Sequence, residues 1–171
     1  MTRYVAFLRG VSPMNCKMAE LKRCFEAAGF TDVKTVLSSG NVAFSAKPAL
    51  VPILEKMAEE MMERQLGRVF QCIVRPSAFL KSLIESDPFG AFDLPAGSKH
   101  VVTFLRKPYE GKIDLPIEQD QALILKLERT EAFSAYVPNE KGPVFMALLE
   151  RTFGKEITTR TLETVKRCSV A

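Results

Sequence analysis

One short polar stretch stands out among the residues that could do chemistry. Ser38, Ser39, Gly40 and Asn41 interrupt two apolar stretches in the segment VLSSGNVAFS, residues 36–45. A two-residue Gly-Asn turn between antiparallel strands would explain the glycine, because hairpin turns favour residues that tolerate positive φ. Such a turn does not require two serines and an asparagine. Their hydroxyl and amide groups therefore form a candidate binding site.

Arg9 and Gly10, which follow the first apolar stretch, would add a positive charge to this site. A guanidinium group offers a fork of hydrogen-bond donors, and a glycine-containing turn can direct backbone N–H groups towards the same point. This combination is typical of anion binding. The alternative is that Arg9 pairs with a carboxylate and that the serines satisfy carbonyls of their own loop, since hairpins select such residues for turn geometry alone.

These residues can meet only if the chain folds in a particular order. Apolar alternation and helical periodicity predict strands at 4–8, 33–38, 41–45 and 69–74, a helix at 17–28, and a second helix from Pro48 and Pro52 to about Gly67. The order β-α-β-β-α-β is that of a ferredoxin-like subdomain. In that plan the third strand lies between the first and second and antiparallel to both. The end of the first strand and the hairpin then share one edge of the sheet.

Two apolar patterns predict what these elements bury. The second helix carries an apolar stripe that we expect to face the sheet, formed by Leu50, Ile53, Leu54, Met57 and Met61. The strand at 4–8 is apolar at both its odd and its even positions, which indicates burial on both faces. Helices cover only one of these faces. We therefore expect the rest of the chain to cover the other.

The second half of the chain predicts a smaller mixed subdomain. Helices are expected at 77–84, 144–153 and 161–168, strands at 100–105, 122–127 and 133–137, and an irregular stretch at 107–119. We therefore predict an α+β fold, in which a ferredoxin-like subdomain at residues 1–76 packs against a second, smaller α+β subdomain at residues 77–171.

Composition narrows the class of protein. Of the 171 residues, 47% are hydrophobic and 26% are charged, as in ordinary globular proteins, and the net charge of +4 mildly favours an anionic partner. No apolar run approaches the ~20 residues that span a bilayer, and no signal peptide is visible. Four distant cysteines and a single histidine lack the spacing of a zinc site. We expect a cytoplasmic protein with no metal, no disulfide and no membrane contact.

Four segments resemble the domain-of-unknown-function family 1697, namely YVAFLRGV, KMAELKRCFEAAGF, SSGNVAF and TTRTLETVKR. The N-terminal motifs are specific, since Arg-Gly after the first strand, Met-x-x-Leu in the helix, Gly-Phe after it and Ser-Gly-Asn-Val occur in order. The resemblance implies an α+β protein of two subdomains, the first ferredoxin-like, and implies no known activity. Arg160 lies in the last segment and is a further candidate for the binding site. Its alternative is an ordinary surface arginine or an ion pair.

The chain departs from the family pattern at two places. The loop after Val11 is cut to residues 12–16, where the family usually has a longer loop that is richer in glycine and asparagine. Thr161, Leu162 and Glu163 stand where the family usually has asparagine and tryptophan. Contacts that such asparagines make with a ligand cannot be carried over to this chain.

Two other classes of function stay open. A sheet of this order also occurs in RNA-binding modules that stack bases on aromatic residues, and Tyr4 stands at the first such position, although Ser39 and Asn41 occupy the others. An unrecognised enzyme is the third possibility, with Cys16 as a nucleophile activated by His100. No nucleophile elbow, Walker loop or dinucleotide fingerprint is present, so we expect no cofactor.

The prediction from sequence is therefore a protein that binds a small anionic ligand or a protein partner at the polar edge of its first sheet. Nucleic-acid binding through the basic surface is the first alternative. The predicted site, which we call the rim, consists of Arg9, Gly10, Ser38, Ser39, Gly40 and Asn41, with Arg160 as a candidate seventh member.

Overall fold

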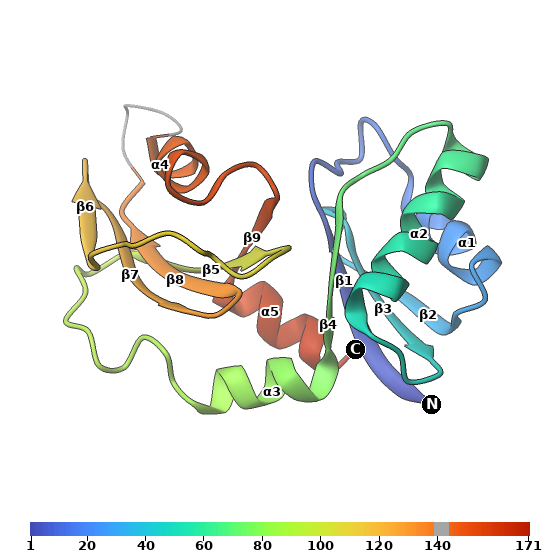
Figure 1. The fold of residues 1–171 in the computed structure, drawn as a ribbon, viewed down its shortest axis with the longest axis horizontal. Coiled ribbons are helices and arrows are strands. Elements are labelled where there is room, and N and C mark those ends of the chain that lie inside the picture. The colour runs from blue at the N-terminus through green and yellow to red at the C-terminus, as the bar shows by residue number, and fades with distance from the viewer. Residues whose placement is uncertain (139–143) are drawn as a thin grey trace. The chain divides into compact units, whose positions relative to one another are not determined.

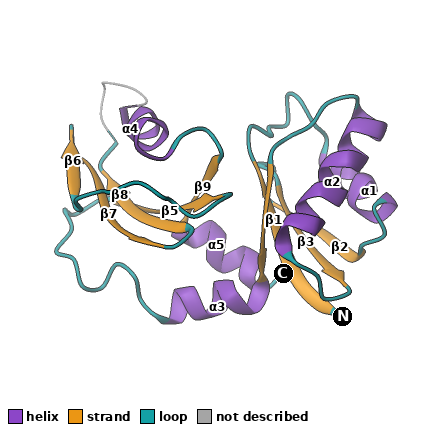
Figure 2. Ribbon diagram, viewed as in Figure 1, coloured by secondary structure: helices purple, strands orange, loops and turns teal. Residues whose placement is uncertain are grey.

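The computed structural model describes residues 1–138 and 144–171, which form a mixed α+β protein with two antiparallel sheets and five helices (Figure 1, Figure 2). The chain divides into two compact units, one made of Met1–Glu85 with Lys166–Ala171 and the other of Ser86–Val165. The subdomain boundary after residue 76 stays a prediction. No helix in the described part of the chain is long and apolar enough to cross a membrane.

The first unit is built on a four-stranded sheet. Its elements are β1 (Thr2–Leu8), α1 (Met18–Ala27), β2 (Thr31–Val36), β3 (Asn41–Ala46), α2 (Val51–Leu66), β4 (Cys72–Pro76) and α3 (Ser77–Glu85). The strand order is β2-β3-β1-β4, and each strand is antiparallel to its neighbours. Strand β1 therefore lies in the interior of the sheet, between β3 and β4.

Both faces of β1 are buried, as its apolar pattern predicts. Helices α1 and α2 contact each other and lie on one face (Figure 1), where Tyr4 and Leu8 belong to the same hydrophobic cluster as Phe25 of α1. On the other face Val5 and Phe7 have no exposed surface, and α3 contacts both β1 and β4. The open face of the sheet is thus covered within the chain.

Strand β4 forms one edge of the sheet, and α2 supplies hydrogen-bond acceptors along that edge. Alternate N–H groups of an edge strand point away from its partner and need acceptors elsewhere. The Cys72 N–H donates to Glu59 Oε2 at 3.1 Å, and the Val74 N–H donates to Glu55 Oε2 at 2.9 Å. The next outward position is Pro76, which has no N–H group. All three outward positions of the edge are therefore accounted for.

The predicted orientation of α2 about its axis is wrong, and the bonds along this edge explain why. Leu50, Ile53 and Met57 of the expected buried stripe are exposed, at 74%, 51% and 37%. The buried residues of the helix are Leu54, Glu55, Ala58 and Met62. The helix is turned about its axis because the carboxylates of Glu55 and Glu59, one turn apart, must face β4.

The second unit contains a five-stranded antiparallel sheet with the order β6-β7-β8-β5-β9. Its elements are β5 (Lys99–Leu105), β6 (Ile117–Gln119), β7 (Ala122–Glu128), β8 (Glu131–Tyr136), α4 (Val144–Phe153), β9 (Ile157–Thr161) and α5 (Leu162–Ser169), whose last four residues belong to the first unit. Helix α4 contacts β7. The sequence prediction includes neither outer strand of this sheet. Strand β6 is only three residues long, and β9 is marked in the sequence only by the β-branched residues Ile157–Thr159.

Replacing Glu55 with alanine should lower the free energy of unfolding by about 1–3 kcal/mol, because the buried Val74 N–H would lose its acceptor. Glu55→Gln keeps an acceptor oxygen and should lose less. The matched control is Glu60→Ala on the same helix, whose side chain is 57% exposed and lies 3.9 Å from Lys56; it should change stability by less than about 0.5 kcal/mol. Urea denaturation followed by circular dichroism measures all three. Equal losses for Glu55→Ala and Glu60→Ala would contradict the role given to this edge.

Candidate functional site

The polar hairpin between β2 and β3 differs in detail from the predicted turn. It is a four-residue loop, residues 37–40, closed by the pair Val36 and Asn41, and not a two-residue Gly-Asn turn. The side-chain amide of Asn41 donates to the Val36 carbonyl at 2.9 Å and to Ser39 Oγ at 3.1 Å. Asn41 also pairs with Phe7 of β1 and is fully buried. The side chain of Asn41 therefore stabilises a loop of four residues instead of two.

The end of β1 and the hairpin are neighbours in space, as the predicted strand order requires. The Leu8 N–H donates to the Gly40 carbonyl at 2.8 Å. Gly40 has φ = +88°, and a Cβ atom at this position would lie 2.8 Å from the Cβ of Val11 and 3.1 Å from the Leu8 carbonyl oxygen. Only glycine fits this close approach without displacement of the neighbouring chain.

The three rim side chains with candidate chemistry, those of Arg9, Ser38 and Ser39, all reach solvent, and Gly10 is also exposed. Arg9 is half-buried, whereas Ser38 and Ser39 are exposed. The Arg9 N–H donates to the Gln71 carbonyl at 2.9 Å, so the backbone that carries the guanidinium group is tied to the segment leading into β4. One positive charge and two hydroxyl groups therefore lie at one end of the sheet. This set can hold an anion, and it offers no evident nucleophile or base.

The loop after Val11, residues 12–16, is stabilised by its own polar residues. Asn15 Nδ2 donates to the Gly10 carbonyl at 2.8 Å, and Asn15 Oδ1 accepts from the Ser12 N–H at 2.8 Å. The N–H groups of Asn15 and Cys16 both donate to the Ser12 carbonyl. These bonds fix the turn that contains Gly10 and directly follows Arg9.

Arg68 is a second positive charge near this end of the sheet, and the sequence interpretation missed it. Its guanidinium carbon lies 4.5 Å from the ring centroid of Phe70, and its charge acts on the thiol of Cys16, at the end of the loop after Val11. Arg68 precedes the segment to which Arg9 is tied. In the sequence, Arg68 could have been identified as a basic residue directly after Gly67, where α2 ends and the chain returns to the sheet.

Cys16 is a poor candidate for a nucleophile. Burial raises the pKa of its thiol above the ordinary value of 9.0, the negative charge of Glu20 raises it further, and Arg68 opposes these effects. The thiolate, which is the reactive form, is therefore disfavoured. His100 lies in the second unit, where its ring stacks on Phe89 at 4.6 Å between centroids. The proposed Cys16–His100 pair stays a prediction.

Tyr4 does not present its ring for base stacking. It is 3% exposed, belongs to the hydrophobic cluster shared with α1, and stacks on Phe44 at 5.7 Å between ring centroids. RNA-binding modules of this strand order need exposed aromatic rings on the sheet. The basis that Tyr4 provided for the nucleic-acid alternative is therefore wrong.

Arg160 belongs to β9 of the second unit, whereas the other rim residues belong to the first unit. Its Nη1 donates to Thr158 Oγ1 at 2.7 Å and to the Thr159 carbonyl at 2.8 Å. Its membership of the rim stays a prediction. Within residues 1–138 and 144–171, no group of three or more His, Cys, Asp or Glu side chains is placed to hold a metal ion, and the four cysteines are buried free thiols.

Comparison with known proteins yields a family and a fold. The family described as "Protein of unknown function (DUF1697)" matches residues 1–131 of the chain. None of the curated proteins compared with the chain matches it. Among solved structures, the conserved bacterial protein SP0830 from Streptococcus pneumoniae is similar over 99% of this chain and 97% of its own, with a TM-score of 0.71 and 20% sequence identity. At this identity the likeness shows the fold alone.

Gly40→Ala should destabilise the protein more than Gly10→Ala. Both glycines have positive φ, +88° and +82°, so both substitutions carry the conformational cost of about 1 kcal/mol that an L side chain has there. Only at Gly40 would the new methyl group meet other atoms within 4 Å. Thermal unfolding of the two variants separates the close contact from the shared φ cost. Equal losses would mean that the packing of Gly40 against Val11 is dispensable.

Cys16 should react slowly with iodoacetamide in the folded protein, because its thiol is buried and its pKa is raised. At pH 8 we expect the rate to be at least about tenfold below that of the unfolded chain in urea. Peptide mass spectrometry assigns the modified cysteine, and Cys72, which is fully buried, serves as the internal reference. Reaction of folded Cys16 as fast as in urea would restore it as a candidate nucleophile.

Proposed function

Because the chain belongs to the DUF1697 family of proteins of unknown function, its function has to be inferred from its own site, and we propose that the rim binds a small anionic ligand. The observation that carries this proposal is the hydrogen bond from Leu8 to Gly40, which places the residue before Arg9 against the exposed serine hairpin. The bond from Leu8 joins the end of β1 to the hairpin, and the bond from the Arg9 N–H to the Gln71 carbonyl ties Arg9 to the segment before β4. In this proposal the guanidinium group of Arg9 and the hydroxyl groups of Ser38 and Ser39 bind the same ligand.

The rim residues have different parts in this proposal. Arg9 supplies charge and forked donors, and Ser38 and Ser39 supply hydroxyl groups. Asn41 is buried and bonded within the loop, so it shapes the hairpin without touching the ligand. Gly40 and Gly10 allow the close packing and the tight turn that bring the segments together. Arg68 adds positive potential from the neighbouring segment, and the membership of Arg160 stays a prediction from sequence.

The fold assignment in this proposal is a ferredoxin-like first subdomain at residues 1–76, followed by a smaller α+β subdomain at residues 77–171. The order β2-β3-β1-β4, with every neighbouring pair antiparallel, supports the first part. We also propose that the protein is cytoplasmic, and the four free cysteines support this location.

Arg9→Ala should abolish most of the stabilisation that inorganic phosphate gives to the protein. Loss of a charge-assisted contact should weaken binding by about 1–3 kcal/mol while the melting temperature without phosphate stays unchanged. The matched control is Arg23→Ala, which removes the same charge from an exposed position on α1. Melting temperature as a function of phosphate concentration, at constant ionic strength, is the measurement.

Three outcomes of this titration would count against the proposal. Two of them are an absence of stabilisation by phosphate in either protein and equal stabilisation of Arg9→Ala and the unmodified protein; either result removes the rim as an anion site. If Arg9→Ala lowers stability without phosphate, Arg9 is architectural. Ser38→Ala then provides a second test, because its exposed hydroxyl can be removed without disturbing the Asn41 bonds.

A further inference from the structure

A separate cavity lies within the second unit, at the end of its sheet where β5 leads into the following loop. Its volume is about 370 Å³, which is within the range of small-molecule sites. Its walls come from the end of β5 and the residues after it, and from the turn between α4 and β9. The side chains that matter are Leu105, Lys107, Tyr109, Glu110, Phe153 and Glu156.

Backbone hydrogen bonds hold these walls in place. Leu105 pairs with Ile157 across β5 and β9, and the Arg106 N–H donates to the Glu156 carbonyl at 3.0 Å. The Gly154 N–H donates to the Glu150 carbonyl at 2.8 Å, at the end of α4. The two segments that line the cavity are therefore parts of one hydrogen-bonded framework.

Part of the lining, which we call the floor of the cavity, is apolar and aromatic and is formed by Leu105, Tyr109 and Phe153. The rings of Tyr109 and Phe153 meet edge to face, with centroids 5.6 Å apart and planes at 87°, and both pack on the hydrophobic cluster that contains Leu105. A Cβ atom at Gly111 would lie 2.6 Å from the Tyr109 hydroxyl, so glycine leaves room for this ring. The apolar part of a ligand would lie on this floor.

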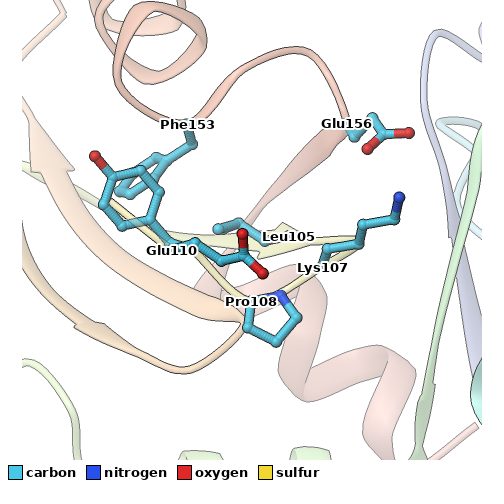
Figure 3. A pocket seen from close by; sticks show the side chains of 7 residues that line it. Leu105, Lys107, Pro108, Glu110, Phe153 and Glu156 are labelled. Atoms are coloured by element: carbon cyan, nitrogen blue, oxygen red, sulfur yellow. The ribbon is translucent and has the colours of Figure 1, made fainter. Parts of the chain in front are cut away.

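The charged side chains around the floor carry a net charge of −1, from Glu110 and Glu156 against Lys107. Within the described residues, none of these three forms an ion pair with another side chain. Figure 3 shows Glu110 and Phe153 on one side of the pocket and Lys107 and Glu156 on the other, with Leu105 between them. Phe153 is also the last residue of α4, and the C-terminal end of a helix favours positive charge.

We propose that this pocket binds a small organic ammonium ion, a primary amine with an apolar or aromatic body. The carboxylate of Glu110 receives the ammonium group beside the aromatic pair, whose ring faces attract cations. The apolar body contacts Leu105 and Phe153. The positive charge of Lys107 opposes this binding and limits its affinity. The proposal concerns the second unit alone and does not depend on anion binding at the rim.

Phenethylamine and 3-phenylpropionate test the predicted charge preference, because both carry a phenyl ring on a short chain and differ in the sign of the charged end. In an NMR titration of the full chain, phenethylamine should shift the amide signals of residues 105–110 and 153–156 in a saturable manner. Phenylpropionate should bind at least about tenfold more weakly. Absence of saturable binding of the amine, equal affinity for both compounds, or shifts confined to other residues would overturn the proposal.

Substitutions in the pocket test which side chains contact phenethylamine. Glu110→Gln should weaken phenethylamine binding about tenfold, and Lys107→Gln should strengthen it. Phe153→Leu keeps apolar volume but removes the ring face, and should also weaken binding. The matched control for the glutamate is Glu118→Gln, exposed on β6 of the same unit, which should leave the affinity unchanged. An unchanged affinity for Glu110→Gln, with the amide spectrum of the folded protein retained, would remove Glu110 from the site and overturn the assignment.

Discussion

The hydrogen bonds required by the outward N–H groups of β4 organise the first unit. An edge strand with unmet donors is costly if it is buried and prone to pairing with other chains if it is exposed. Here Glu59 and Glu55 of α2 accept from Cys72 and Val74, and Pro76 removes the third donor. Because the two carboxylates must face β4, the rotation of α2 about its axis is set. Leu54, Ala58 and Met62 then pack on the sheet, while Leu50, Ile53 and Met57 are left towards solvent.

The same strand connects this edge to the rim. Gln71, directly before β4, accepts from the Arg9 N–H, while Leu8 donates to Gly40 on the other side of β1. The end of β1 is therefore held from two directions, by the segment before β4 and by the hairpin before β3. Asn41 plays in the hairpin the part that Glu55 plays at the edge, since each is a buried polar side chain that bonds to backbone groups. The polar side chains of Asn41 and Glu55 therefore stabilise the backbone of the first unit.

Apolar periodicity was sufficient to predict most elements of the chain, including the helix at Val144–Phe153, and the burial of β1 on both faces. It failed where a polar side chain bonds to a backbone group distant in sequence. The apolar residues of α2 suggested one buried face, and the glutamate bonds to β4 impose another. The hairpin was assigned two loop residues because Gly-Asn favours short turns, whereas the bonds of Asn41 close a loop of four. The cavity of the second unit joins residues 105–110 to 153–156, and a single sequence carries no signal for that pairing.

The first unit is discontinuous in the chain, since it combines Met1–Glu85 with Lys166–Ala171. Arg3 of β1 donates to the Ala171 carbonyl at 3.1 Å, and Cys168 is fully buried. A ribosome synthesises the residues of the second unit before those that complete the first. The first unit can therefore be completed only after the whole of the second has been synthesised, and the second can fold before the first is complete.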